Sequence, residues 1–226
     1  MVTLKQKLKN CDLTFGSWLT IPNQAVVEIM GTAEFDWLVI DTEHAAIDIH
    51  QLQNLVGWIQ AQNMKALVRV SKNEEVIIKR VMDAGADGVI VPMVKNKEEA
   101  KMAVDFVYYP PLGKRGVGLS RAQKYGIGFQ EYQEWLENEA VVIAQIEHID
   151  SVNNLEEILC TRGIDGIIVG PYDLSASMGK PGKYDDEDVK MALLKVDETC
   201  RKLGKPLGFH VIQSDHQKVL EKVEIG

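Results

Sequence analysis

The stretch AGADGVIV, at Ala84–Val91, returns in varied form as RGIDGIIVG at Arg162–Gly170. In both copies a glycine follows a helical pattern, as it does where helices end, and Asp-Gly then leads into β-branched residues. A helix that passes through a short turn into a buried strand is the repeating unit of an alternating α/β fold. Its repetition predicts a parallel sheet with helical crossovers.

Apolar runs of this kind occur seven times along the chain. Each is four to eight residues long and continuous rather than alternating, which is typical of parallel strands covered on one or both faces. The predicted strands are Thr14–Ile21, Trp37–Ile40, Ala66–Val70, Gly88–Val91, Val141–Ile146, Gly166–Val169 and Leu207–Val211.

Apolar residues spaced as on one face of a helix fill most of the gaps between these runs. The predicted helical stripes are Val26–Ala33, Leu52–Ile59, Ala100–Val107, Val152–Leu159, Val189–Val196 and Val219–Val223. Alternation of strands and helices fits both an open doubly wound sheet and a (β/α)8 TIM barrel. We favour the barrel, because polar residues follow the ends of many different strands and no GxGxxG follows the first strand.

Seven strands are one fewer than a (β/α)8 barrel has. The sequence therefore predicts a single α/β domain over residues 1–226 whose last βα unit is truncated, very short or missing.

Composition excludes several classes of protein. With 226 residues, 46% of them hydrophobic, the chain can bury a sizeable core and is not disordered. A net charge of −8 without a long Lys/Arg run argues against a nucleic-acid partner. No apolar run approaches membrane-spanning length, no signal peptide is evident, and Cys11, Cys160 and Cys200 show no CxxC spacing. These features predict a cytoplasmic protein with no membrane partner.

Three polar residues, Asp41, Glu43 and His44, directly follow the second predicted strand. A carboxylate beside a histidine fixes its tautomer and makes it a better base. The sequence does not show which acid touches His44, and capping of the next helix explains the same residues equally well.

Arg69 is a charged residue inside an otherwise apolar strand, and Glu147 is one at the end of another. A buried charge needs a partner, so Arg69 either forms an internal ion pair or binds an anionic ligand. Glu147 and Asp173 follow the fifth and sixth strands, which are neighbours in a barrel. Two such carboxylates suit Mg²⁺ or Mn²⁺. The alternatives are a Glu147–Arg69 ion pair and a helix cap at Asp173.

Tyr108–Gly128 is a long irregular stretch with five glycines. Long loops in compact domains are often functional, so we interpret it as a lid over the site that carries Arg115 and Arg121. The alternative is a surface connection with solvated arginines. Trp18 either walls the site or packs in the core. His210, at the end of the last strand, either points into the site or is structural.

Taken together and in order, several motifs resemble the metal-dependent (class II) pyruvate aldolases of the HpcH/HpaI family, which includes 2,4-dihydroxyhept-2-ene-1,7-dioate aldolases. The motifs are GSW (Gly16–Trp18), FDWLVIDTEH (Phe35–His44), LVRV (Leu67–Val70), DAGADGVIVPMV (Asp83–Val94), YYPPLGKRG (Tyr108–Gly116), IAQIEH (Ile143–His148) and GPYDLS (Gly170–Ser175). The resemblance covers essentially the whole chain.

This resemblance implies a TIM barrel of the phosphoenolpyruvate/pyruvate type that assembles as a homo-oligomer, a trimer or hexamer. It implies cleavage of a 4-hydroxy-2-oxoacid to pyruvate and an aldehyde, with Mg²⁺, Mn²⁺ or Co²⁺ as cofactor. The implied metal ligands are Glu147 and Asp173. The implied catalytic residues are His44, with Asp41 as its partner, and Arg69, which binds the pyruvate oxygen. The implied substrate-site residues are Gln145, Trp18 and Ser175. Asp83 is implied to approach a neighbouring subunit's site.

The sequence departs from the family pattern at two positions beside these residues. Ser71 stands where a proline is expected, and Ala45 stands where the motif usually has glycine. Two alternative functions stay open. One is a citryl-type thioester carbon–carbon lyase of the same superfamily, and the other is a barrel that has lost catalysis.

Overall fold

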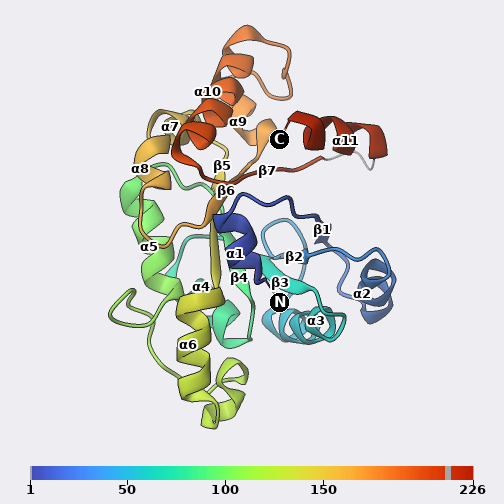
Figure 1. Cartoon of the computed structure of the whole chain (residues 1–226), viewed down its shortest axis with the longest axis vertical. Coiled ribbons are helices and arrows are strands. Elements are labelled where there is room, and N and C mark those ends of the chain that lie inside the picture. The colour runs from blue at the N-terminus through green and yellow to red at the C-terminus, as the bar shows by residue number, and fades with distance from the viewer. Residues whose placement is uncertain (1, 212–214, 226) are drawn as a thin grey trace.

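Seven parallel strands form one sheet in the computed structural model, which describes residues 2–211 and 215–225 (Figure 1). The strands are β1 (Gly16–Leu19), β2 (Trp37–Asp41), β3 (Lys65–Arg69), β4 (Gly88–Val91), β5 (Val141–Ile146), β6 (Gly166–Val169) and β7 (Leu207–Phe209). Every predicted strand is confirmed, and its ends move by at most two residues.

Helices connect these strands and cover the sheet. They are α1 (Leu4–Lys9), α2 (Gln24–Gly31), α3 (Ile49–Ala61), α4 (Glu75–Asp83), α5 (Lys97–Val107), the 3-10 helix η1 (Arg121–Gly126), α6 (Phe129–Glu139), α7 (Ile149–Asn153), α8 (Leu155–Leu159), α9 (Pro171–Ser177), α10 (Glu187–Leu203) and α11 (His216–Ile225). The stripe predicted on α3 is confirmed, since all four of its apolar residues are buried. The stripe on α2 is partly wrong, because Val27 is buried and Ile29 is exposed. None of these helices is long and apolar enough to cross a membrane.

The order of the strands decides between the two folds that the sequence left open. Each strand pairs with its neighbour in the sequence, from β1 to β7, and all pairs are parallel. A doubly wound sheet reverses its order at a switch point, so that fold is excluded. Among the residues that the structure describes, β1 and β7 share no backbone pairing. The fold is therefore α/β with a seven-stranded parallel half-barrel.

Alternate residues of each strand enter two separate cores. Those on one side, such as Ile40 and Val68, pack against the helices in the larger core. Those on the other side, such as Val39 and Leu67, meet across the inside of the half-barrel. Leu4 of α1 joins this inner cluster, and α1 lies against the sheet near the centre of Figure 1. Burial on both faces explains why the strand sequences are continuously apolar.

Strand register places the charged residues that the sequence analysis singled out. Asp41 and Arg69 are direct partners in the β2–β3 pairing, and both end their strands. Glu147 follows the last residue of β5. Because parallel strands all end at the same edge of the sheet, these side chains gather at one end of the half-barrel.

Candidate functional site

An ion pair between Asp41 and Arg69 forms the centre of the candidate site. Arg69 Nε donates to Asp41 Oδ1 at 3.0 Å and Nη2 donates to Oδ2 at 2.7 Å, so the pair is bidentate. Both side chains are buried. Burial raises the pKa of Asp41, but the hydrogen bonds and charge of Arg69 outweigh it and bring that pKa below its ordinary value. Asp41 is therefore a fixed anion that orients the guanidinium.

Asp41 is held by Arg69 and by backbone donors, so its predicted partnership with the His44 ring stays a prediction. Asp41 Oδ1 accepts hydrogen bonds from the backbone N–H groups of Glu43 and His44, which makes it the cap of this turn. The carboxylate beside the His44 ring is Glu43, with 3.8 Å between Nε2 and Oε2. Sequence alone left this choice open, and the structure gives Asp41 the turn after β2, whereas the cap of the next helix, α3, is Asp48.

Glu43 lies between the His44 ring and the guanidinium. Its Oε2 is 3.3 Å from Arg69 Nε and is a buried atom without a hydrogen bond. Burial raises the pKa of Glu43, and the charges of Arg69 and His44 offset this only in part. The His44 side chain is 66% exposed, so its ring is open to an incoming molecule while Glu43 supports it from the protein side.

Glu147 is held in place by two donors. The backbone N–H of Met93 donates to Oε1 at 2.7 Å, and Gln145 Nε2 donates to Oε2 at 2.7 Å. Met93 has a φ of 54°, a left-handed conformation that costs a non-glycine residue energy and is typical of functional sites. No ion pair joins Arg69 to Glu147 among the described residues, so the Glu147–Arg69 alternative is wrong.

Burial raises the pKa of Glu147 to about 7, because the side chain is only 4% exposed. The nearby charges of Glu43 and Asp173 contribute to this rise of the pKa, while the Met93 N–H and Arg69 act in the opposite direction. Asp173, in the first turn of α9, is thus close enough to interact with Glu147 through its charge. Carboxylates gathered in this way favour a bound cation.

The residues around Glu147 and Asp173 suit a divalent cation bound partly by protein and partly by other oxygens. A Cβ at Gly170 would lie 3.1 Å from Glu147 Oε2, so the glycine leaves space at this carboxylate. Gln145 Oε1, beside it, is buried without a hydrogen bond. No three His, Cys, Asp or Glu side chains within residues 2–211 and 215–225 enclose a metal ion. Water and substrate oxygens would have to complete the six ligands that Mg²⁺ prefers.

Trp18 and His210 extend the site toward the open edge of the sheet. The Arg69 guanidinium carbon lies 4.6 Å from the centre of the Trp18 ring. His210, directly after β7, stacks on the same indole with ring centres 4.8 Å apart. Trp18 also packs on the inner core cluster, so it both lies beside the site and belongs to the core.

Ser175 does not join this cluster through a hydrogen bond. Its hydroxyl donates to the Tyr172 carbonyl and accepts from the Gly182 N–H, so both bonds fix the segment around α9. Its part in substrate binding remains a prediction.

The interpretation of Tyr108–Gly128 as a lid over this site is wrong. Arg121 donates to the Ala84 carbonyl and to Gln60, which are at the ends of α4 and α3. These helix ends lie where the strands begin, opposite the site. Arg115 is fully buried and donates to the Tyr132 hydroxyl at 2.8 Å. The loop therefore packs beneath the half-barrel.

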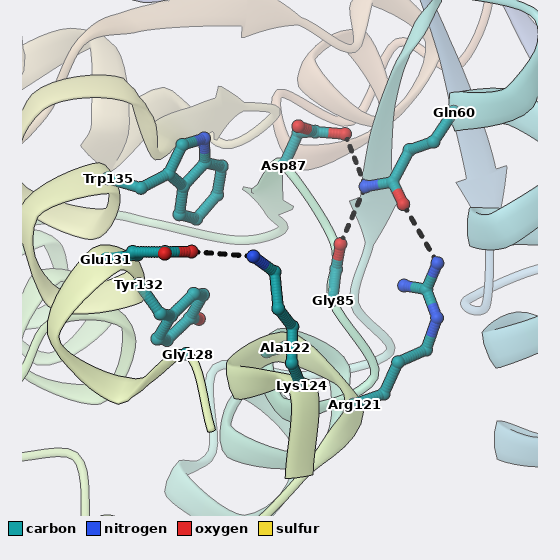
Figure 2. A pocket seen from close by; sticks show the side chains of 10 residues that line it. All are labelled: Gln60, Gly85, Asp87, Arg121, Ala122, Lys124, Gly128, Glu131, Tyr132 and Trp135. Atoms are coloured by element: carbon teal, nitrogen blue, oxygen red, sulfur yellow. Dashed lines mark hydrogen bonds and ion pairs between the residues drawn. The ribbon is translucent and has the colours of Figure 1, made fainter. Parts of the chain in front are cut away.

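A hollow of about 450 Å³ lies in this same region, away from the charged cluster. Figure 2 shows Gln60 at its edge, donating to Gly85 and Asp87 and accepting from Arg121. Its lining side chains largely bind one another. We therefore place the candidate site at the strand ends and not in this hollow.

Comparisons with known proteins identify the same family as the sequence motifs do. Residues 14–225 match the model of the HpcH/HpaI aldolase/citrate lyase family. The chain is 32% identical over 225 residues to a hydroxypyruvate/pyruvate aldolase from Roseobacter denitrificans, covering 99% of this chain and 87% of that protein. It is 37% identical over 206 residues to a pyruvate aldolase from Rhizobium etli, covering 91% and 81%.

A solved structure agrees with these sequence matches. The crystal structure of an HpcH/HpaI aldolase/citrate lyase family protein from Burkholderia cenocepacia matches with a TM-score of 0.92 and 31% identity, covering 100% of this chain and 90% of that one. The match extends over the strands that carry Asp41, Arg69 and Glu147. The chain belongs to the HpcH/HpaI aldolase/citrate lyase family.

Proposed function

We propose that this protein is a metal-dependent aldolase that cleaves a 4-hydroxy-2-oxoacid to pyruvate and an aldehyde. The observation that carries the proposal is the placement of Arg69, fixed by Asp41, at the same strand ends as the carboxylates Glu147 and Asp173. Relatives at 32% and 37% identity are named pyruvate aldolases. We further propose that residues 1–226 form one TIM-barrel domain of the phosphoenolpyruvate/pyruvate type that lacks its last βα unit within this stretch.

A divalent cation, Mg²⁺, Mn²⁺ or Co²⁺, would be held by Glu147 and Asp173 and would polarise the 2-oxo group as a Lewis acid. Arg69 meets the negative charge that develops on the substrate oxygen as the C3–C4 bond breaks. Its guanidinium is oriented before the reaction by Asp41, so little reorganisation is needed. Gln145 and Met93 keep the Glu147 carboxylate in place.

Proton transfer falls to His44 in this proposal. Its ring removes the proton of the 4-hydroxyl, the C4–O bond becomes the carbonyl of the aldehyde, and the electrons of the C3–C4 bond form the enolate of pyruvate. Protonation at C3 then gives pyruvate. Glu43 stabilises the imidazolium while it carries the proton.

The test is release of pyruvate, followed through lactate dehydrogenase, from a panel of 4-hydroxy-2-oxoacids. It is run with Mg²⁺, with Mn²⁺ and with EDTA, on the wild type and on a Glu147→Gln/Asp173→Asn variant. Glu134→Gln, at an exposed position of α6, is the matched control. Metal-dependent release that the double variant lacks is the expected result. A folded, metal-supplied wild type that releases no pyruvate from any substrate would contradict the proposal.

Glu43→Gln is expected to lower kcat about tenfold, because His44 loses the carboxylate that supports its charged form. Double-mutant cycles for kcat test this against the pairing that the resemblance implied. Glu43→Gln should be non-additive with His44→Ala, whereas Asp41→Asn should be non-additive with Arg69→Ala. Strong coupling of Asp41 to His44, with none between Glu43 and His44, would refute this assignment.

We also propose that the chain associates with copies of itself as a trimer or hexamer. The support is a set of exposed apolar side chains on the loop beneath the half-barrel, with Leu119 78% and Ile127 94% exposed. Such side chains on one loop are typical of a contact surface. Leu119→Asp/Ile127→Asp should lower the mass measured by light scattering toward that of one chain, while Leu220→Asp on α11 should not. A wild type that is already monomeric would exclude this association.

A further inference from the structure

The stacked rings of Trp18 and His210 connect the two edge strands of the sheet. Trp18 belongs to β1, and His210 comes directly after β7. These strands lie at opposite ends of the sheet order and share no backbone pairing within the described residues. Even so, the two rings lie 4.8 Å apart with 26° between their planes. Side chains therefore link the edges at the end of the half-barrel where the charged residues gather.

Trp18 also restrains Arg69. Asp41 holds one edge of the guanidinium through two hydrogen bonds, while the indole contacts it at 4.6 Å. The carboxylate fixes the direction of the plane, and the aromatic ring limits its displacement. A Trp18 ring that is less well ordered would therefore allow the Arg69 guanidinium to move more.

His210 is suited to stacking as a neutral ring. Burial lowers the pKa of His210, and the positive charge of Arg69 lowers it further, while Asp41 acts weakly in the opposite direction. A neutral imidazole can pack on the indole without adding a second positive charge beside Arg69. No hydrogen bond involves the His210 ring among those found for the described residues, so stacking is its main contact.

We propose that His210 is a positioning residue for Arg69, acting through the stack on Trp18. This inference rests on the proposed aldolase function, in which Arg69 meets the developing negative charge. It assigns a role to the open edge of the sheet, where the ring of the residue after β7 keeps the guanidinium aligned with the reacting oxygen.

Two substitutions at His210 separate stacking from the space that the ring fills. His210→Phe keeps an aromatic ring, whereas His210→Leu keeps bulk without a stack. We expect His210→Leu to lower kcat for pyruvate release by roughly five- to tenfold with little change in KM, because misalignment affects the transition state most. His210→Phe should stay within about twofold of wild type. His50→Leu, at an exposed position on α3, is the matched control.

Two further readouts do not need cleavage of the whole substrate. The rate of deuterium exchange at C3 of pyruvate depends on Arg69 but not on the aldehyde, and it should fall in parallel with kcat. In metal-free protein, the NMR signal of the Arg69 Nε–H should carry a ring-current shift from Trp18. That shift should persist in His210→Phe and diminish in His210→Leu.

The outcomes distinguish this inference from the proposed function. A wild type without exchange or cleavage contradicts the function itself. An active wild type whose His210→Leu variant matches it in kcat, exchange and Arg69 signal overturns the positioning role alone. Equal damage from His210→Phe and His210→Leu also overturns it, because stacking would then not be the property that matters.

Discussion

Arg69→Ala is expected to lower kcat/KM for pyruvate release by about 10²- to 10³-fold, the loss typical when a donor to a developing oxyanion is removed. It should also destabilise the fold by about 3–5 kcal/mol, because Asp41 is left as a buried carboxylate without its partner. The coupled assay and chemical unfolding measure the two effects. Arg80→Ala, at an exposed position of α4, should change neither.

A second variant separates catalysis from stability. Arg69→Ala/Asp41→Ala removes both charges, so part of the lost stability should return while activity stays low. Arg69→Lys should also be poorly active, since an ammonium cannot form the bidentate contact with Asp41. Activity close to wild type in either Arg69 variant would remove this residue from the proposed reaction.

The sequence predicted which residues gather at the site better than it predicted how they pair. Apolar runs located every strand, and parallel strands place their last residues at one edge, so Arg69 and Glu147 could be expected there. Pairing across strands depends on register, which the sequence does not show. The family resemblance pairs Asp41 with His44, three residues away, whereas register puts Asp41 beside Arg69. The pairing of Glu43 with His44 could have been predicted, because the two residues are adjacent in the chain.

Backbone contacts were beyond reach of the sequence for a different reason. The N–H that holds Glu147 comes from Met93, where a non-glycine residue adopts a positive φ. Every residue except proline has a backbone N–H, so the residue type at position 93 does not predict this hydrogen bond. His210 was recognised as a candidate, but its contact with Trp18 joins strands that are farthest apart in the sheet order.

The position of the long loop could have been predicted from topology. Strands of a barrel all run one way and the helices run back, so the segment after α5 must emerge where the strands begin. Tyr108–Gly128 directly follows α5 and therefore lies opposite the site. Length and glycine content favoured a lid, but they carry no information about which end of the barrel a loop covers.

Glu147→Gln is expected to abolish metal-dependent cleavage, with a fall of more than about 10²-fold in kcat/KM at saturating Mg²⁺. The amide keeps the size of the side chain and can still accept from Met93, but it cannot balance the charge of a cation. The rise in melting temperature that Mg²⁺ gives the wild type should also disappear. Glu134→Gln should retain both responses. A metal-induced stabilisation of the same size in Glu147→Gln would place the cation elsewhere.

The pKa of Glu147, raised by burial to about 7, gives this prediction a pH dependence. Since the folded-state value lies above the ordinary 4.5, the protonated carboxyl favours the folded protein. This contribution to the free energy of unfolding is complete below about pH 4.5 and is lost as the pH rises through about 7. The total loss over this range is about 3 kcal/mol. Metal-free wild type should therefore lose stability over this range more steeply than Glu147→Gln.

The affinity for the cation should depend on the protonation of Glu147 in the same pH range. Below about pH 7 each Mg²⁺ must displace a proton from Glu147, so affinity should fall by up to about tenfold per pH unit; well above pH 7 it should become nearly independent of pH. At pH 7 binding should release roughly half a proton, which calorimetry in buffers of different ionisation enthalpy measures directly. Binding that releases no proton at pH 6 would show that Glu147 is already ionised there. Burial would then not keep this carboxyl protonated in the metal-free protein, and the predicted link between cation binding and proton release would be wrong.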